Sequence, residues 1–222
     1  MGKRAMTDAA KEQKAAAILN CAAELFLASD YETVKMSAVA KKMHISNGIL
    51  FVYFPTKQTL FFSLLMREYH ARVNAMEQLL QGGQPKSLAA LFDLILKDLE
   101  FQLKNTLYIR LEAIRAAILE KNIDSERFIA RKTALYERMC AAAETAAIPG
   151  VIDAREVLKI FHVQTALIGG FKMAGELPEP LREQLVNQGL NDFVHDFKQD
   201  TLRTMRLYLQ ALRAEKANPA IR

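Results

Sequence analysis

The segment Val34–Leu60, VKMSAVAKKMHISNGILFVYFPTKQTL, constrains the fold more than any other part of the chain. Its pattern predicts a short helix that ends near Met43, a tight turn at 44–46, and a second short helix that Pro55 ends. Ser46 directly precedes the second helix, where a serine hydroxyl can accept a hydrogen bond from a free backbone amide. Two short helices joined in this way predict a helix-turn-helix unit, which places its second helix in the major groove of DNA.

Long stretches with helical periodicity dominate the rest of the 222 residues, and no strand alternation is seen. We therefore predict an all-α protein with an N-terminal three-helix head and a C-terminal helical-bundle body. The break at 81–85 gives the expected domains: a head at 9–56, a connecting helix at 57–80, and a ligand-binding and dimerisation body at 81–222. Gly189 is a candidate to divide the last helical region. The expected helices with both ends assigned are Ala9–Ala28, Met36–Met43, Asn47–Phe54, Ser87–Leu103, Thr106–Lys121, Ser125–Ala147 and Leu181–Ala214. Thr56 is expected to cap the connecting helix, and Asp124 to cap Ser125–Ala147. Asp153 is expected to cap a further helix that ends near Ala174.

Charge and composition narrow the class of protein. The first 60 residues carry eight basic and five acidic side chains, so positive charge is densest at the N-terminal end, which fits a nucleic-acid partner. No apolar run approaches the roughly 18–20 residues that span a bilayer, and the N-terminus lacks a signal-peptide core. The two cysteines show no metal-ligand spacing. We expect a cytoplasmic protein with no membrane, metal or cofactor role.

The start of the predicted second helix of the unit carries the candidate base contacts. The Asn47 amide can pair with adenine, Gly48 lets the backbone approach the duplex, and Ile49 and Val52 can touch thymine methyl groups. Lys57 opposes the dipole of its own helix, which is explained if a DNA phosphate binds there. Lys41 and an arm of Lys3 and Arg4 are further candidates for phosphate contacts. The predicted DNA-binding set is Lys35, Lys42, Ser46, Asn47, Gly48, Ile49, Phe51, Val52, Tyr53, Thr56 and Lys57.

Residues Ile18–Leu60 resemble the DNA-binding domain of the tetracycline-repressor (TetR) family of bacterial transcriptional regulators. The matching features are Ile18-Leu19, Ala22-Ala23, Leu25-Phe26, Tyr31, Val39-Ala40, Ile45-Ser46, Gly48, Leu50, Tyr53-Phe54, Pro55-Thr56-Lys57 and Leu60. The length and the helical remainder also fit this family.

The chain departs from the family pattern at several of these positions. Asp30 and His44 stand where the family usually has glycine, although His tolerates a left-handed backbone better than most residues. Ile49, Phe51 and Val52 stand where the family often has threonine, tyrosine and histidine. The stretch 46–56 holds no charged side chain, which excludes arginine readout of guanine from this helix. We expect an operator rich in A·T pairs at the contacted positions.

The resemblance implies a homodimer and a pocket for a small-molecule effector in the body. Small residues recur at every fourth position of one predicted helix, and the last helical region carries an apolar face; both suit a dimer interface. The predicted interface set is Ala166, Gly170, Ala174, Phe193, Phe197, Met205 and Tyr208. The predicted effector pocket is Phe101, Tyr108, Glu112, Arg115, Phe128, Phe161, His162 and Gln164.

No catalytic constellation is seen, because the chain has no Gly-rich phosphate loop and no nucleophile elbow, and its four histidines are scattered. The sequence therefore predicts a dimeric DNA-binding regulator and not an enzyme. Its expected action is repression, ended when a hydrophobic or amphipathic effector releases a palindromic operator. Two alternatives stay open. One is an all-α small-molecule-binding protein or enzyme without a DNA role, and the other is an architectural DNA-binding protein that needs no effector.

Overall fold

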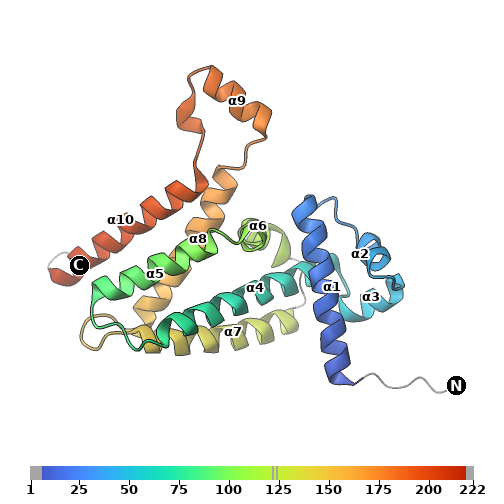
Figure 1. Cartoon of the computed structure of the whole chain (residues 1–222), viewed down its shortest axis with the longest axis horizontal. Coiled ribbons are helices and arrows are strands. Elements are labelled where there is room, and N and C mark those ends of the chain that lie inside the picture. The colour runs from blue at the N-terminus through green and yellow to red at the C-terminus, as the bar shows by residue number, and fades with distance from the viewer. Residues whose placement is uncertain (1–6, 122, 124, 219–222) are drawn as a thin grey trace.

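The computed structural model describes residues 7–121, 123 and 125–218, and within these ranges the protein is all-helical with one isolated bridge between Ile148 and Ile152. The predicted all-α class is confirmed. The proposed Lys3–Arg4 arm and the Asp124 cap lie outside the described residues. Figure 1 shows a head of three helices at one end, a long helix that leads from it into the body, and a short helix that projects away from the body. The elements are α1 Asp8–Ala28, α2 Met36–Lys42, α3 Asn47–Tyr53, α4 Lys57–Leu80, α5 Leu88–Gln102, α6 Thr106–Ile114, the π-helix η1 Arg115–Leu119, α7 Ser125–Ala146, α8 Ala154–Ala174, α9 Glu179–Asn187, the 3-10 turn η2 Asn191–Phe193, and α10 Phe197–Ala217.

Side-chain caps fix the predicted helix starts. The hydroxyls of Ser46, Thr56 and Ser87 each accept a hydrogen bond from the backbone N–H three residues on, at 3.2, 3.0 and 3.2 Å. Asp153 forms a complete capping box with Glu156, so two free backbone donors at the start of α8 are satisfied reciprocally. The predicted caps at Ser46, Thr56 and Asp153 are confirmed, and Ser87, predicted as the first residue of its helix, is the N-cap of α5.

Two helices end earlier than the periodicity indicated. The predicted helix Thr106–Lys121 is α-helical only as far as Ile114 and continues as the π-helix η1. The predicted Leu181–Ala214 helix is divided into α9, η2 and α10, with Gly189 at φ +74° two residues after the end of α9. Glycine takes this left-handed backbone without the Cβ clash that other residues incur. Phe193 consequently lies in η2 and not on the last helix.

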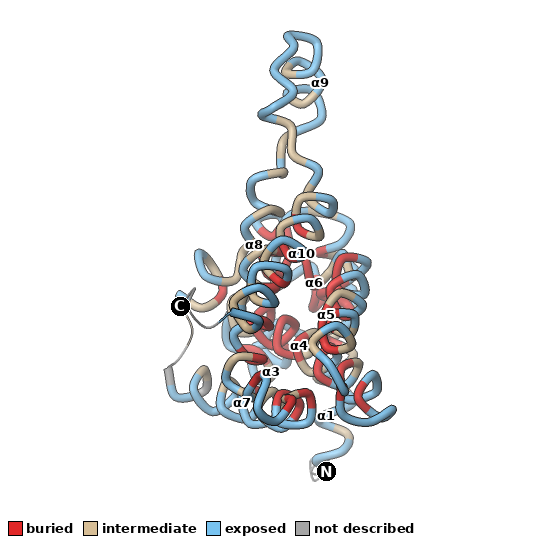
Figure 2. Tube along the Cα trace, turned by 90° about the vertical axis from the view of Figure 1, so that its left-hand side faces the viewer, coloured by how far each residue is buried: buried red, intermediate tan, exposed pale blue. Residues whose placement is uncertain are grey.

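The core of the head is continuous with the first half of α4. Phe26 and Tyr31 each meet Phe61 edge-to-face, with ring centroids 5.1 and 4.9 Å apart, and Val39 and Leu50 close the core from the helix-turn-helix unit. Figure 2 shows the buried residues concentrated along the middle of the molecule, while α9 is largely exposed. The orientation of the head is therefore tied to the same helix that supports the body.

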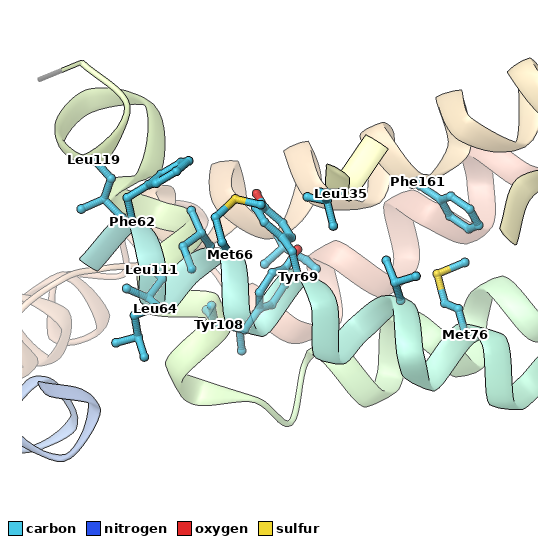
Figure 3. Close-up of a cluster of buried hydrophobic side chains, with 14 of the residues drawn as sticks. Phe62, Leu64, Met66, Tyr69, Met76, Tyr108, Leu111, Leu119, Leu135 and Phe161 are labelled. Carbon is cyan, nitrogen blue, oxygen red and sulfur yellow. The ribbon is translucent and has the colours of Figure 1, made fainter. Parts of the chain in front are cut away.

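The body packs α8 against α6, α7 and α10, while α4 lies against α5, α6 and α7. Figure 3 shows apolar side chains of α4, including Phe62, Met66 and Met76, among those of the surrounding helices. No single described helix has both the length and the apolar content to cross a bilayer; only the α3–α4 pair, bent by 51°, meets that criterion when its parts are taken together.

We predict that Phe61→Ala lowers the free energy of unfolding by about 3–5 kcal/mol, because it leaves a cavity between the head and α4. Leu27→Ala, at an exposed position of α1, is the control and should change it by less than about 0.5 kcal/mol. Urea unfolding followed by circular dichroism measures both variants. A loss below about 1 kcal/mol for Phe61→Ala would contradict this account of the core.

Candidate DNA-binding surface and ligand cavity

The turn between α2 and α3 depends on a left-handed residue. His44 has φ +53°, the only positive φ among the described non-glycine residues, and its N–H donates to the Lys41 carbonyl at 3.1 Å. The N–H of Ile45 then donates to the Ala40 carbonyl at 3.0 Å, which closes the end of α2. Histidine therefore occupies a conformation that usually favours glycine, and the helix-turn-helix geometry is kept.

The short helix α3 presents an uncharged face to solvent. Leu50 is fully buried and fixes the helix against the head, whereas Asn47 and Gly48 at its N-terminal end are exposed. Phe51 is exposed and Val52 is 82% exposed, although side chains of these apolar types are more often buried. An exposed apolar face on a short, well-anchored helix is typical of a surface that contacts a partner.

The structure gives Lys57 a different contact from the predicted phosphate. Its ammonium donates to the Tyr31 carbonyl, lies 3.4 Å from the Glu32 carbonyl oxygen, and sits 3.9 Å from the centroid of the Tyr31 ring. Burial lowers the pKa of Lys57, and nearby Glu32 only partly opposes that effect. Lys57 thus holds the loop between α1 and α2 against the start of α4.

The other predicted cations of the head lie at the surface. Lys35 and Lys41 are exposed, and Lys42 pairs with Glu24 at 2.7 Å across two half-exposed side chains. Exposed ion pairs of this kind contribute little to stability and exchange readily with other partners. Lys42 therefore remains available to a phosphate, whereas Lys57 is engaged inside the head.

A cavity of about 540 Å³ lies in the body between α4, the α6–η1 segment, α7 and α8. Figure 3 shows where four of its wall residues lie, Tyr69 and Met76 on α4, Leu135 on α7 and Phe161 on α8. Most of the wall is apolar, and the volume is typical of small-molecule sites. The lining consists of Tyr69, Arg72, Val73, Met76, Arg115, Ile129, Lys132, Thr133, Leu135, Tyr136, Met139, Ala142, Phe161, His162, Thr165 and Ala166.

The structure distributes the predicted pocket residues over three environments. Arg115, Phe161 and His162 line the cavity. Tyr108, Glu112 and Gln164 are buried and lie outside its lining, in hydrogen-bond networks with lining residues.

Two predicted wall residues need correction. Phe101 is 54% exposed near the end of α5 and does not line the cavity, because α5 turns that face to solvent. Phe128 is also outside the lining, and its ring packs against Phe62 with centroids 5.5 Å apart.

Arg72 is the centre of one buried network. Its guanidinium makes two bonds to Asp98 Oδ2, at 2.7 and 3.2 Å, and one each to Gln164 at 2.8 Å, Thr165 at 3.1 Å and Tyr108 at 3.4 Å. Burial alone would lower the pKa of Arg72, but the Asp98 carboxylate outweighs it and raises that pKa. All five N–H donors of the guanidinium are therefore engaged.

Glu112 is the centre of the second network. Its carboxylate accepts from the Tyr69 hydroxyl and from Arg115 Nε at 2.6 Å. Burial, and then Glu112, raise the pKa of Tyr69 well above its usual value, so Tyr69 stays a neutral donor. A Cβ added to Gly169 would lie 3.5 Å from Glu112 Cγ, so this glycine brings α8 close to α6.

Sequence reasoning missed the part of the cavity that α4 and α7 supply. The signal was present on α4, where Tyr69, Arg72 and Met76 recur at intervals of three and four and place one arginine on an apolar face. Lys132 and Thr165 carried no comparable signal, because neither spacing nor composition distinguishes them from surface residues.

The predicted dimer face is exposed in part. Ala166, Gly170 and Ala174 are exposed along α8, and a Cβ added at Gly170 would meet no described atom within 4 Å. Met205 is fully buried inside the protomer, so the structure removes it from the predicted interface.

The remaining members of the predicted face differ in exposure. Phe197 and Tyr208 on α10 are partly buried against the protomer's own core. Phe193 is 63% exposed in η2 and not on α10.

The helix-turn-helix head and the cavity-bearing helical body together define an all-α DNA-binding regulator. Residues 18–64 match the family described as bacterial regulatory proteins, tetR family, and residues 66–216 match the tetracyclin repressor-like C-terminal domain. The chain belongs to the TetR family of bacterial transcriptional regulators.

Solved structures of other regulators are similar at low identity. Native NalD of Pseudomonas aeruginosa, the secondary repressor of the MexAB-OprM multidrug efflux pump, is 21% identical, over 83% of this chain and 98% of NalD, with a TM-score of 0.47. The regulator FadR of Bacillus subtilis, solved with stearoyl-CoA, is 15% identical, over 88% of this chain and 95% of FadR, also with a TM-score of 0.47. No curated protein matches the chain.

We predict that Asp98→Ala lowers the free energy of unfolding by about 3–5 kcal/mol, because it leaves the Arg72 cation buried without its counter-charge. Asp93→Ala, on the exposed side of the same helix, is the matched control and should cost less than about 0.5 kcal/mol. Chemical denaturation gives both values. Similar small losses for the two variants would show that the network does not hold the cavity wall.

Proposed function

We propose that this regulator is a homodimeric repressor that binds a palindromic operator through α3 and releases it when a hydrophobic or amphipathic effector enters the body. The observation that carries the proposal is one chain with both an exposed α3 and a mostly apolar cavity in the body, joined by α4. A dimer is required because a palindrome presents two half-sites about 34–36 Å apart, or multiples of that distance.

The proposed DNA contacts follow from exposure and hydrogen-bonding capacity. Asn47 reads adenine, and Ile49 and Val52 contact thymine methyl groups. Lys35 and Lys42 bind flanking phosphates, and free amides at the start of α4 bind another beside Thr56. The remaining members of the proposed surface are Ser46, Gly48, Phe51 and Tyr53, with Lys57 supplying positive charge from within the head.

The proposed dimer interface uses the exposed side of the C-terminal helices. Ala166, Gly170 and Ala174 allow a second copy of α8 to approach closely, and Phe193, Phe197 and Tyr208 supply apolar surface beside them. Met173 is also exposed on α8, which extends the apolar area available for burial. Sedimentation of the full chain at micromolar concentration tests this arrangement directly.

Arg110 provides a route from the cavity to the head. From α6 it donates to the Ser29 carbonyl at 2.7 Å and to Asp30 at 3.2 Å, and its guanidinium carbon lies 4.4 Å from the centroid of the Phe26 ring. The same short helix carries Glu112, whose partner Arg115 lines the cavity. A displacement of α6 by a ligand would therefore move the end of α1. A coupling of about 1–3 kcal/mol suffices to change operator occupancy several-fold.

We predict that Asn47→Ala weakens binding to a selected operator by about 1–3 kcal/mol, or roughly 5- to 150-fold, because an amide–adenine pair is lost. The operator comes from selection on a random duplex library, and fluorescence anisotropy gives the affinity. Gln81→Ala, which removes an exposed amide at the opposite end of α4, should leave it unchanged. Selection of G·C pairs at the contacted positions would contradict the proposed readout.

We also predict that Arg110→Met uncouples the two sites. A compound that raises the melting temperature of the wild type would still bind the variant, but its effect on operator affinity would fall several-fold. Arg206→Met, which removes an exposed arginine 3.9 Å from Glu100, is the control and should respond as the wild type does. Undiminished release in Arg110→Met would exclude this route, and failure of every stabilising compound to release DNA would favour effector-independent binding.

A further inference from the structure

The cavity wall is asymmetric in charge. Three cationic side chains, Arg72, Arg115 and Lys132, contribute to it, while no Asp or Glu is among its lining residues within the described ranges. The carboxylates that balance these cations, those of Asp98, Glu112 and Glu120, belong to the layer behind the lining. The wall therefore exposes cations to a ligand on an otherwise mostly apolar surface.

Arg72 is not the group that would hold a ligand. Its five donors are all engaged by protein acceptors, and its side chain is almost completely buried. Exchanging one of these bonds for a bond to a ligand would leave a buried acceptor unsatisfied, which costs about 1–3 kcal/mol.

Arg115 and Lys132 are different, because their side chains remain 28% and 30% exposed at the cavity. Arg115 uses Nε for Glu112 and Nη1 for Glu120. The Nη2 group of Arg115 makes no hydrogen bond with a described residue, and a lysine ammonium carries three donors. Each of the two cations thus has donors that no described residue engages.

Glu120 bridges these two cations. One of its carboxylate oxygens lies 2.8 Å from Arg115 Nη1 and the other 2.7 Å from Lys132 Nζ. The second oxygen is buried and has no aligned hydrogen bond among the described residues, so this contact is an ion pair only. The carboxylate follows directly after η1, whose last turn is closed by the bond from the Glu120 N–H to the Arg115 carbonyl at 2.9 Å.

We propose that the effector is an anionic amphiphile, a carboxylate on an apolar body, which takes the place of the Glu120 carboxylate between Arg115 and Lys132. The inference rests on the proposed effector function of this cavity. The apolar body would lie against Val73, Met76 and Phe161, and the headgroup would accept charge-assisted hydrogen bonds from the two cations.

The surroundings favour an anion over a neutral or cationic headgroup. Burial would lower the pKa of Arg115, but Glu112 outweighs it and raises that pKa, so the guanidinium stays charged. A cationic headgroup would meet Arg115 and Lys132 first, because the carboxylates of Glu112 and Glu120 that balance them are not among the lining residues, and an alcohol would make only neutral-acceptor bonds.

Displacement of Glu120 also connects ligand binding to the head. The carboxylate ties the end of η1 to α7 through Lys132, and η1 continues α6, which carries Arg110. Release of that tie would allow η1 and α6 to move together. The anion would thus both occupy the cavity and remove the contact that holds its movable wall.

The test is calorimetric titration of the full chain with octanoate, octan-1-ol and octylammonium, which share one chain and differ in headgroup charge. Octanoate should bind the wild type at least about tenfold more tightly than octan-1-ol, with octylammonium weakest. Naphthalene-2-carboxylate then shows whether a flat aromatic acid or an alkyl acid fits better. Equal or weaker binding of octanoate relative to octan-1-ol, or no binding of any of the three, overturns the proposal.

Variants test the displacement itself. Glu120→Gln should strengthen octanoate binding several-fold and leave octan-1-ol unchanged, because the competing carboxylate is gone. Glu126→Gln, exposed in the first turn of α7, is the matched control and should change neither. Lys132→Met should remove most of the preference for octanoate. A preference for octanoate that persists unchanged in both Glu120→Gln and Lys132→Met overturns the proposed site.

The wild-type series does not depend on whether the variants fold, and circular dichroism checks each variant. Failure here is distinguishable from failure of the proposed function. If octanoate binds through Arg115 and Lys132 but does not release the operator, the anion site is supported and ligand-controlled repression is contradicted. If octan-1-ol binds better than octanoate and releases the operator, ligand-controlled repression is supported and the anion site is contradicted.

Discussion

One face of α4 is buried from Leu60 to Leu80, and the rest of the structure depends on this constraint. This 24-residue helix, about 36 Å long, contributes Leu60 and Phe61 to the core of the head and Tyr69, Arg72 and Met76 to the wall of the cavity. Because close-packed cores resist gradual deformation, a change at the cavity end of α4 has to be accommodated at the other end or at its neighbours. The body and the DNA-binding head are thus parts of one packed unit.

Two buried or partly buried polar clusters, centred on Arg72 and on Glu120, connect the helices of the body through directional contacts that apolar packing alone does not supply. The Arg72 network closes on itself, with each donor assigned to a protein acceptor, and so fixes α4, α5 and α8 relative to one another. The cluster around Glu120 is more exposed and less completely satisfied. The Arg72 network therefore stabilises the wall of the cavity, whereas the cluster around Glu120 leaves donors that a ligand could engage.

Much of the fold could be predicted because local chemistry determines it. Ser46, Thr56 and Asp153 cap the helices that follow them, as the sequence predicts, and the start of α5 next to Ser87 is predicted within one residue. The π-helix that follows Ile114 could not be predicted, because nothing in the periodicity separates it from a continued α-helix.

The candidate sites were harder to predict, because their geometry comes from contacts far apart in the chain. Lys57 could be placed near DNA from its position, but its contact with the Tyr31 carbonyl depends on how the preceding loop folds back. Met205 belongs to an apolar helix face, and sequence periodicity does not say whether that face meets the same protomer or another copy. Lys132 becomes a wall residue only once α7 lies beside α4.

We propose that occupancy of the cavity and occupancy of the operator are energetically coupled within this chain. Thermodynamic linkage requires such coupling to be reciprocal. The most direct measurement is therefore the affinity of a cavity ligand for the free protein and for the protein saturated with operator. We expect the operator to weaken ligand binding by the same factor by which the ligand weakens operator binding. A ligand affinity that is identical with and without DNA would contradict it.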